Sequence, residues 1–239
     1  MSKHSKWAKI KRNKGIADVK KGGAFTKLGN AIAIAARSGA DPEANLKLRL
    51  AIDKARAQNM PKDTIERSIA RGAGTLEGQI IEEMLYEGFG PGGVAVIIEA
   101  ATDNTNRTVN DLKRVLQDHG GRLGGPGSVA RLFERKGFIS IPDASLDDTL
   151  ELALIDAGAE DIQKKDGITI TTAFDRLEAV RRAAIASGLT PEESGVEWVS
   201  HEYILIPKEK QEALQDFFSA LDALDDVQEW HVNVDLETL

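Results

Sequence analysis

The chain has 239 residues, of which 41% are hydrophobic and 29% are charged, a balance that is typical of a globular protein and excludes a wholly disordered one. It contains no cysteine, which excludes disulfides, thiolate nucleophiles and Cys-based zinc sites and is typical of a reducing, cytoplasmic environment. The first residues lead into no apolar segment, and the longest apolar stretch is far too short for a bilayer. We therefore expect neither a signal peptide nor a membrane partner.

Charge is distributed unevenly along the chain. Residues 1–72 contain 17 Lys and Arg against 6 Asp and Glu, whereas residues 73–239 contain 14 against 32. A surface with this excess of cations attracts polyanions, because bound phosphates release their condensed counterions. The acidic remainder repels the same ligand. We predict that the basic third binds nucleic acid or the ribosome; the alternative is a charged surface that is merely solvated.

Apolar residues at helical spacing predict three short amphipathic helices in this basic third. The first ends at Gly39. The second begins with Asp41 as its N-cap and Pro42 at its first helical position. The third begins at Pro61 and ends at Gly72. Together they form a small bundle.

Beyond residue 78 the hydrophobic pattern changes to that of strands and helices in alternation. We predict strands at 80–87, 94–101 and 129–133, with a helix at 105–119. The following elements are strand 138–141, helix 146–157, strands 161–164 and 168–172, helix 175–187 and strand 196–200. This β-α-β-β-α-β order is that of the ferredoxin-like split unit. The segment 203–206, a helix at 208–221 and a strand at 227–234 remain, and we expect these C-terminal elements to complete the sheet begun at residue 80.

The predicted fold is therefore a multi-domain α+β protein. Residues 1–78 form the N-terminal three-helix bundle. Residues 79–136 and 202–239 form a middle α+β domain that the C-terminal segment completes. Residues 137–201 form a ferredoxin-like (βαββαβ) domain inserted into the middle domain.

Gly88, Gly90 and Gly93 satisfy the spacing of the dinucleotide-binding fingerprint. That site requires a helix directly after the glycines to receive the pyrophosphate. Here Pro91 lies inside the motif and a strand follows it. We therefore predict a glycine-rich hairpin turn and no cofactor.

Two further segments contain residues whose role is either structural or functional. Residues 103–108 lie where a strand leads into a helix, so their polar side chains either cap the helix or contact phosphate. The glycine-rich segment 120–128 either forms a structural turn or brings backbone N–H groups to a ligand. With the hairpin turn, these segments form a candidate second surface: Gly88, Gly90, Pro91, Gly92, Gly93, Asn104, Asn106, Arg107, Thr108, Gly121, Gly124, Gly125, Gly127 and Ser128. If these loops serve a separate step, changing Gly90 or Gly124 to Val is expected to impair function with little loss of nucleic-acid affinity.

Catalytic patterns are scarce. The four histidines His4, His119, His201 and His231 have no partner at metal-ligand spacing. The adjacent acidic pairs point to different faces of a helix or strand, so they do not converge on a substrate. We therefore expect no enzymatic activity, no metal, no cofactor and no small-molecule substrate.

The segment at 4–7, with Trp7 among lysines, suits nucleic acid, because the indole can stack on a base while ammonium groups meet phosphates. The alternative is that Trp7 anchors the segment on the bundle. The candidate nucleic-acid-binding residues are Lys3, His4, Ser5, Lys6, Trp7, Lys9, Lys11, Arg12, Lys14, Lys20, Lys21, Lys27 and Arg37.

Several strings carry a family resemblance along nearly the whole chain. They are HSKW at 4–7, FTK at 25–27, DP at 41–42, LAIDKA at 50–55, NMP at 59–61, IARG at 69–72, YEGFGPGG at 86–93, DNTNRT at 103–108, GSVA at 127–130, AGAED at 157–161 and DDVQE at 225–229. With these strings the chain resembles the YebC/PmpR family. The resemblance implies three domains, with a ferredoxin-like domain inserted in an α+β domain, and no enzymatic activity.

The resemblance also implies a function, in one of two forms. Family members are described as DNA-binding transcriptional regulators, and relatives, one of them mitochondrial, as translation factors that bind the ribosome and relieve stalling at proline-rich stretches. A DNA-binding regulator that acts through the basic N-terminal domain is our first hypothesis, although no helix shows a clear helix-turn-helix pattern. The alternative is a factor associated with rRNA and the ribosome, since a Lys-rich segment with a Trp suits irregular RNA.

Overall fold

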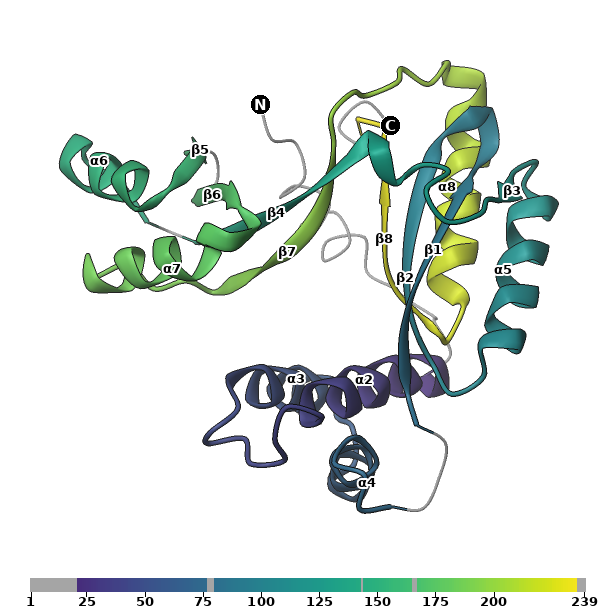
Figure 1. The fold of residues 1–239 in the computed structure, drawn as a ribbon, viewed down its shortest axis with the longest axis horizontal. Coiled ribbons are helices and arrows are strands. Elements are labelled where there is room, and N and C mark those ends of the chain that lie inside the picture. Colours follow the sequence, from purple (N-terminus) through teal and green to yellow (C-terminus); the bar gives the residue numbers. More distant parts are fainter. Residues whose placement is uncertain (1–20, 77–79, 143, 165–166, 236–239) are drawn as a thin grey trace. The chain divides into compact units, whose positions relative to one another are not determined.

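The computed structural model describes residues 21–76, 80–142, 144–164 and 167–235. In these residues the protein is a mixed α+β structure with seven α-helices and two antiparallel sheets (Figure 1), which confirms the predicted fold class. The chain divides into two compact units. The larger unit contains the described residues of Ile16–Ala130 and Ile206–Trp230, and the smaller unit contains those of Arg131–Leu205 and His231–Leu239. None of the described helices is long and apolar enough to cross a membrane.

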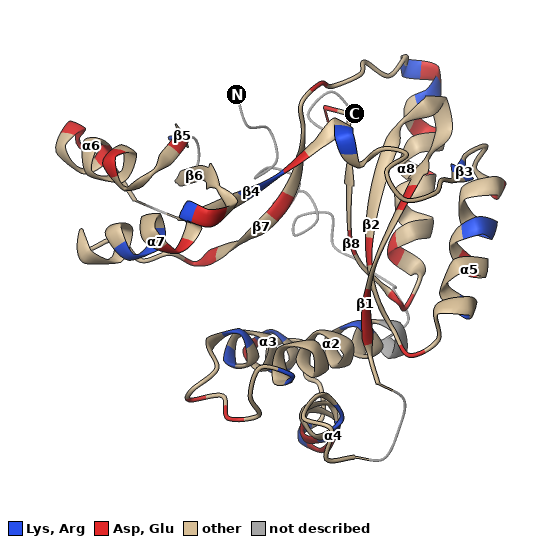
Figure 2. Ribbon diagram, viewed as in Figure 1, with Lys and Arg blue, Asp and Glu red and all other residues tan. Residues whose placement is uncertain are grey.

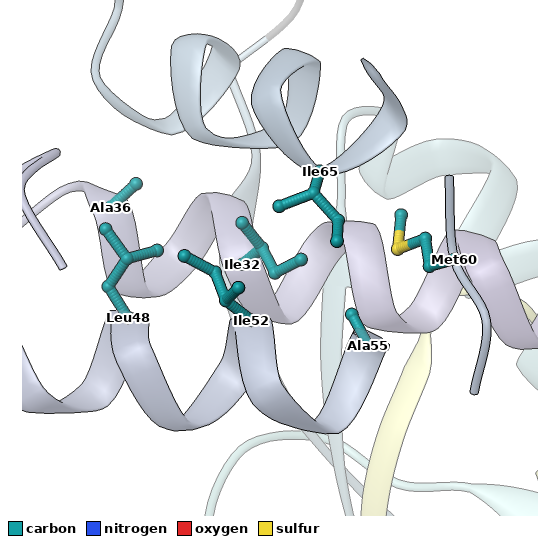
Figure 3. Packing of buried hydrophobic residues seen from close by; sticks show 7 residues of the cluster. All are labelled: Ile32, Ala36, Leu48, Ile52, Ala55, Met60 and Ile65. Atoms are coloured by element: carbon teal, nitrogen blue, oxygen red, sulfur yellow. The ribbon is translucent and has the colours of Figure 1, made fainter. Parts of the chain in front are cut away.

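The first helices of the larger unit form a bundle of α2 (Lys21–Ala36), α3 (Leu46–Ala57) and α4 (Lys62–Gly72). Figure 3 shows Ile32, Ile52 and Ile65, one from each helix, pointing toward one another. The buried cluster comprises Ile32, Ala36, Leu48, Ile52, Ala55, Met60 and Ile65. These positions recur every three or four residues, so each helix buries one stripe and leaves its polar positions outside.

The predicted cap of the second helix is wrong. The N-cap of α3 is Asn45, whose side-chain oxygen accepts a hydrogen bond from the Leu48 N–H at 3.1 Å. The Asn45 amide also donates to the carbonyls of Ala35 and Gly39, both at 2.8 Å. Asp41 instead accepts from the Glu43 N–H, in a turn before the helix. An amide can cap one helix while donating to the end of another, which a carboxylate cannot do.

The sheet of the larger unit has the order β3-β1-β2-β8. Its strands are β1 (Glu82–Phe89), β2 (Ala95–Thr102), β3 (Arg122–Leu123) and β8 (Val227–Val232). Helices α5 (Thr105–Asp118) and α8 (Lys208–Ala223) pack against each other beside this sheet (Figure 1). The C-terminal segment therefore joins the sheet that begins at β1, as the hydrophobic pattern predicts.

A buried carboxylate links β8 to β2 and α5. Asp226 is buried, with only 8% of the residue exposed. It accepts hydrogen bonds from the Thr108 hydroxyl at 2.6 Å and from Arg107 Nη2 at 2.9 and 3.0 Å. Its own carbonyl accepts from the Ala101 N–H of β2 at 2.8 Å. Because bonds to a charged acceptor are about twice as strong as neutral ones, these contacts fix the place of β8 at the edge of the sheet.

The smaller unit contains β4 (Phe133–Ile141), α6 (Asp148–Ala157), β5 (Ala159–Gln163), β6 (Ile168–Ala173), α7 (Leu177–Ala186) and β7 (Glu193–Ser200). This is the β-α-β-β-α-β order expected from the sequence, and the strand order in the sheet is β5-β6-β4-β7. A short 3₁₀ turn, Phe174–Arg176, precedes α7. Both helices pack on one face of the sheet, around Ile139, Ile170 and Leu154.

One predicted strand is wrong. Residues 129–133 do not form a strand, because Ala130–Leu132 form a 3₁₀ turn and β4 begins at Phe133. The backbone N–H groups of Val129 and Ala130 are bound by the Glu87 carboxylate, so they cannot join a ladder. At 203–206 the described chain makes a single β-bridge, between Ile204 and Val234.

The Asp226 contacts lead to a stability prediction. Replacing Asp226 by Asn removes the charge that Arg107 and the Thr108 hydroxyl bind, and leaves a buried amide in their place. We expect a loss of about 1–3 kcal/mol in the free energy of unfolding. The matched control is Asp225→Asn at the exposed neighbouring position, with an expected change of at most about 0.5 kcal/mol. Urea unfolding measures the free energy of unfolding of both variants. Equal losses would contradict the role of the Asp226 carboxylate in joining β8 to β2 and α5.

Candidate nucleic-acid interface

The exposed side of α3 is the basic surface that the structure describes. Its buried stripe, centred on Leu48 and Ile52, packs into the bundle and leaves the remaining positions in solvent. Those positions carry Lys47, Arg49, Lys54 and Arg56 against the single acid Asp53, and Figure 2 shows the basic residues along the helix. A short amphipathic helix thus presents one predominantly cationic face.

Most of these cations are available to a ligand. Arg49 meets Glu43 at 3.8 Å, and Arg56 meets Asp53 at 3.6 Å. Such long, exposed pairs contribute at most about 1 kcal/mol, so a phosphate can replace the carboxylate. Among the described residues, no ion pair is found for Lys47, Lys54, Arg37 or Arg67, all of which are exposed.

Two leucines interrupt the charge on the same helix. Leu46 is 41% exposed and Leu50 is 53% exposed, and they lie four residues apart, on one face of α3. Apolar side chains next to cations can contact sugars or bases while the cations meet phosphates. The exposed side of α3, here called the α3 face, is therefore both cationic and locally apolar.

The structure describes few of the candidate basic residues. Ten of them lie outside the described residues: Lys3, His4, Ser5, Lys6, Trp7, Lys9, Lys11, Arg12, Lys14 and Lys20. Lys21 begins α2, and only its backbone is described. Arg37 is exposed just after the end of α2. The candidates with described side chains are thus Lys27 and Arg37.

Lys27 lies inside the larger unit. Its ammonium group donates to the Asp222 carbonyl at 2.6 Å, in the last turn of α8. This is the end of a helix where unpaired carbonyls and the helix dipole favour a cation. Lys27 therefore has a structural partner within the chain, which separates it from the α3 face.

Two residues that the sequence did not single out connect the bundle to the sheet. The Asn30 amide, in α2, donates to the Ala101 carbonyl of β2 at 3.1 Å. Arg71, in α4, in turn donates to the Asn30 oxygen at 2.9 Å. Asn30 is almost fully buried, at 3% exposure. In the sequence, the signal that could have identified Asn30 is a single polar amide followed by the apolar run of the same helix.

A cleft of about 880 Å³ in the larger unit brings together three of the predicted site residues. Lys27, Arg107 and Thr108 all line it, together with Arg71 and Arg114. Five aspartates line it as well: Asp103, Asp111, Asp222, Asp225 and Asp226. Because charges of both signs are mixed here, this cleft does not have the uniform positive potential that attracts a polyanion.

The segment at 103–108 caps α5. The Asn104 side chain accepts from the Arg107 N–H at 3.1 Å, while Asn106 is exposed. The Arg107 guanidinium binds Asp226 and, at 3.1 Å, Asp103. These contacts, the hydrogen bond to Asp226 above all, raise the pKa of Arg107. Of the two alternatives, capping is therefore the role that the structure shows for Asn104.

The glycines at 88–93 form a hairpin turn between β1 and β2, as predicted. The Gly90 N–H donates to the Val94 carbonyl at 2.7 Å. Gly92 and Gly93 have φ angles of 72° and 80°, a backbone conformation that residues other than glycine rarely adopt. The short 3₁₀ turn Pro91–Gly93 leads directly into a strand, so no helix N-terminus is present to bind a pyrophosphate.

The second glycine-rich loop is bound by a carboxylate of the chain itself. Glu87, which is 7% exposed, accepts hydrogen bonds from the N–H groups of Gly127, Val129 and Ala130 at 2.6, 2.7 and 2.8 Å. Burial raises the pKa of Glu87, but these three hydrogen bonds together outweigh it, and the pKa lies below its ordinary value. These three N–H groups are therefore not available to a ligand. Of the two alternatives for this loop, the structural turn is the one that applies to them.

The valine variants are unsuitable for testing a separate functional step. A side chain at Gly90 would approach the Phe217 ring to 2.7 Å, and one at Gly124 would collide with Ser128. Gly121 is equally confined, by the Phe89 carbonyl, whereas Gly125 has open space around it. Valine at position 90 or 124 therefore disturbs packing and cannot separate a functional step from folding.

Comparison with known proteins identifies the class to which this architecture belongs. A sequence model described as the TACO1/YebC protein N-terminal domain matches residues 5–75, and one described as the TACO1/YebC second and third domain matches residues 81–234. The chain therefore belongs to the TACO1/YebC family, and the resemblance found in the sequence is confirmed.

Individual relatives match over almost the full chain. A probable transcriptional regulatory protein of Chlorobaculum tepidum is 46% identical over 99% of this chain and 96% of its own length. One from Treponema pallidum is 45% identical over 99% of this chain and 98% of its own length. The crystal structure of a conserved hypothetical protein from Aquifex aeolicus superposes with a TM-score of 0.75 at 40% identity, covering 91% of each chain.

The lowered pKa of Glu87 predicts a dependence of stability on pH. A carboxyl whose folded pKa is depressed stabilises the fold above its ordinary value of 4.5, and this contribution is lost as the pH falls through the folded pKa. Glu87→Gln should therefore lower the free energy of unfolding at pH 7, and the difference from the original chain should shrink below pH 4.5. Glu83→Gln, at an exposed position of the same strand, is the control. Urea unfolding at pH 7 and below pH 4.5 measures the free energy of unfolding of each variant. A difference between Glu87→Gln and the original chain that does not change with pH would contradict the role of the Glu87 carboxylate.

Proposed function

We propose that this protein is a non-enzymatic, cytoplasmic regulator of transcription that binds DNA through its basic N-terminal domain. The observation that carries the proposal is the separation of charge. Residues 1–72 hold 17 of the 31 Lys and Arg but only 6 of the 38 Asp and Glu. The names of the relatives from Chlorobaculum tepidum and Treponema pallidum as probable transcriptional regulatory proteins support the regulatory role.

The α3 face is the described part of the DNA-binding surface. At a rise of about 1.5 Å per residue its 12 residues extend over about 18 Å, a length comparable to half a turn of B-DNA. Lys47 and Lys54 lie seven residues apart, on one side of the helix, so both can meet the same backbone. Residues 1–20 add seven Lys and Arg against one Asp. Phosphate contacts of this kind contribute affinity and orient the protein on DNA, whereas the base sequence is read by other contacts.

The domain organisation of the proposal follows the sequence. Residues 1–78 form the nucleic-acid-binding bundle, and residues 79–136 with 202–239 form the middle domain. Residues 137–201 are a ferredoxin-like insertion. The chain leaves the larger unit's sheet before β4 and returns to it at β8, which supports an insertion.

Salt-dependent DNA binding tests the proposal. One variant, Lys47→Gln with Lys54→Gln, neutralises the α3 face, and a second neutralises Lys6, Lys9, Lys11 and Arg12. Each lost phosphate contact should flatten the slope of log K against log salt by about 0.9, hence by up to about 1.8 for the α3 variant. The matched control is Lys208→Gln with Lys210→Gln, at exposed positions of α8.

The same titration with RNA of equal length separates the two kinds of nucleic acid. The proposal expects the original chain to bind duplex DNA more tightly than RNA. It also expects both basic variants, but not the α8 control, to lose affinity and slope. Unchanged slopes would show that neither surface contacts phosphate. Tighter binding to RNA or ribosomes would contradict DNA as the target.

A further inference from the structure

The bundle contains a small pocket where α4 packs against α2. Its volume is about 270 Å³, and the residues that line it come from α2, α4 and the segments on either side of α4. Among these described lining residues none belongs to α3, so the pocket is separate from the α3 face. All of them lie between residues 25 and 76, within the larger unit.

Two small residues line the pocket where the helices meet. A side-chain carbon at Gly29 of α2 would lie 3.0 Å from the hydroxyl of Ser68 in α4 and 3.6 Å from the Met60 methyl group. Larger side chains at positions 29 and 68 would occupy the space between the helices. Glycine weakens a helix interior, and in α2 this close approach explains its presence.

Arg71, which lines the pocket, has a guanidinium group with one unused N–H. Its Nη2 donates to the Asn30 oxygen at 2.9 Å, which holds the group in place. Its Nε is buried and has no hydrogen-bond partner among the described residues. A buried donor without an acceptor is unfavourable, and most buried donors in folded proteins have a partner. An acceptor atom of a ligand in the pocket would satisfy this N–H.

Arg67 adds a second cation to the same pocket. It lies four residues before Arg71, hence on the same side of α4. It is exposed, and no ion pair is found for it among the described residues. A guanidinium presents planar N–H donors that match the oxygens of a phosphate. The two arginines therefore make the pocket suited to an oxyanion.

The pocket also has apolar walls. Phe25 of α2 is half-buried, Met60 is buried and Leu76 is exposed, and all three line the pocket. Aromatic rings stack on nucleobases, and the Met thioether is polarisable and makes favourable contacts with aromatic rings. A ligand that matches this lining combines a planar aromatic group with an anionic group.

The size of the pocket limits this ligand further. Pockets for drug-sized ligands have volumes of about 300–1,000 Å³, and this pocket lies just below that range. A dinucleotide is too large for it. A nucleoside monophosphate has the matching chemistry, because it joins one planar base to a phosphate that guanidinium groups can bind.

We propose that this pocket, here called the α2–α4 pocket, binds one nucleoside monophosphate, with the base against Phe25 and Met60 and the phosphate on Arg67 and Arg71. The ligand is either an unpaired nucleotide of a DNA strand or the free mononucleotide, since both have this chemistry. The strand form rests on the function proposed above and gives the bundle a preference for DNA with an unpaired base. Binding of the free mononucleotide does not depend on that function.

Titration of the full chain with mononucleotides tests the pocket directly. The four deoxynucleoside monophosphates, their nucleosides and inorganic phosphate are added separately, and calorimetry measures each affinity. We expect at least one monophosphate to bind about tenfold more tightly than its nucleoside or phosphate, because it alone uses both the apolar wall and the arginines. Backbone amide shifts measured by NMR should concentrate in α2 and α4. Equal affinities for phosphate and every monophosphate, or shifts centred on other elements, would overturn the proposal.

A matched set of variants tests the two halves of the ligand. Arg67→Gln removes an exposed cation, so the affinity for the monophosphate should fall about tenfold. Phe25→Leu should lower the same affinity by a similar factor and leave the weak affinity for inorganic phosphate unchanged. Lys113→Gln, at an exposed position of α5, removes one positive charge and is the control. An equal loss in the control, or no loss in Arg67→Gln, would contradict the site, and circular dichroism checks that each variant keeps its fold.

DNA with one unpaired nucleotide separates the two sources of the ligand. A duplex with a single bulged nucleotide is compared with the fully paired duplex of the same length. If the strand is the source, the bulged duplex binds about tenfold more tightly, and Arg67→Gln removes this preference while Lys113→Gln retains it. Equal affinities for the two duplexes, with the monophosphate bound as expected, assign the pocket to the free mononucleotide.

The remaining outcomes are also decisive. If the chain shows neither a preference for the bulged duplex nor binding of a monophosphate, the proposal is overturned. If no DNA is bound at all, the proposed function fails, while the titration with mononucleotides still decides whether the α2–α4 pocket is a binding site.

Discussion

The buried carboxylate of Asp226 is the contact on which the larger unit depends. It joins residues near the C-terminal end of the chain to β2 and to the start of α5, through Thr108 and Arg107. Because β8 must take its place beside β2, the chain that leaves after residue 130 has to return. Residues 131–205 can therefore form a separate compact unit without interrupting the sheet of the first.

A second buried carboxylate, Glu87, explains the glycine-rich loop. An anion is best placed where several backbone N–H groups converge, and here the chain supplies that anion from β1. Glycine-rich segments that look like ligand cradles thus serve the fold, and the candidate for recognition is the cationic face of α3. Acidic and basic residues have different roles in the larger unit: buried acids organise its fold, and exposed cations gather on the bundle.

Local patterns predicted the elements well, since apolar stripes such as Leu48–Ile52 and the β-α-β-β-α-β order depend on nearby residues. Features set by distant partners were missed. The choice of Asn45 as cap depends on where the carbonyls at the end of α2 lie. The partner of Lys27 is 195 residues away, and the absence of a strand at 129–133 follows from Glu87, more than 40 residues earlier. The charge division needed no structure, because it is a property of composition.

The central claim is that a cationic bundle surface contacts nucleic acid while the acidic body stays away from it. Photochemical cross-linking of DNA to the full chain, followed by mass spectrometry of the peptides, tests it most directly. The account predicts cross-links within residues 1–76, including peptides of α3, and none within the sheet of the smaller unit. Cross-links concentrated in β4, β6 or β7, with α3 unmodified, would contradict it.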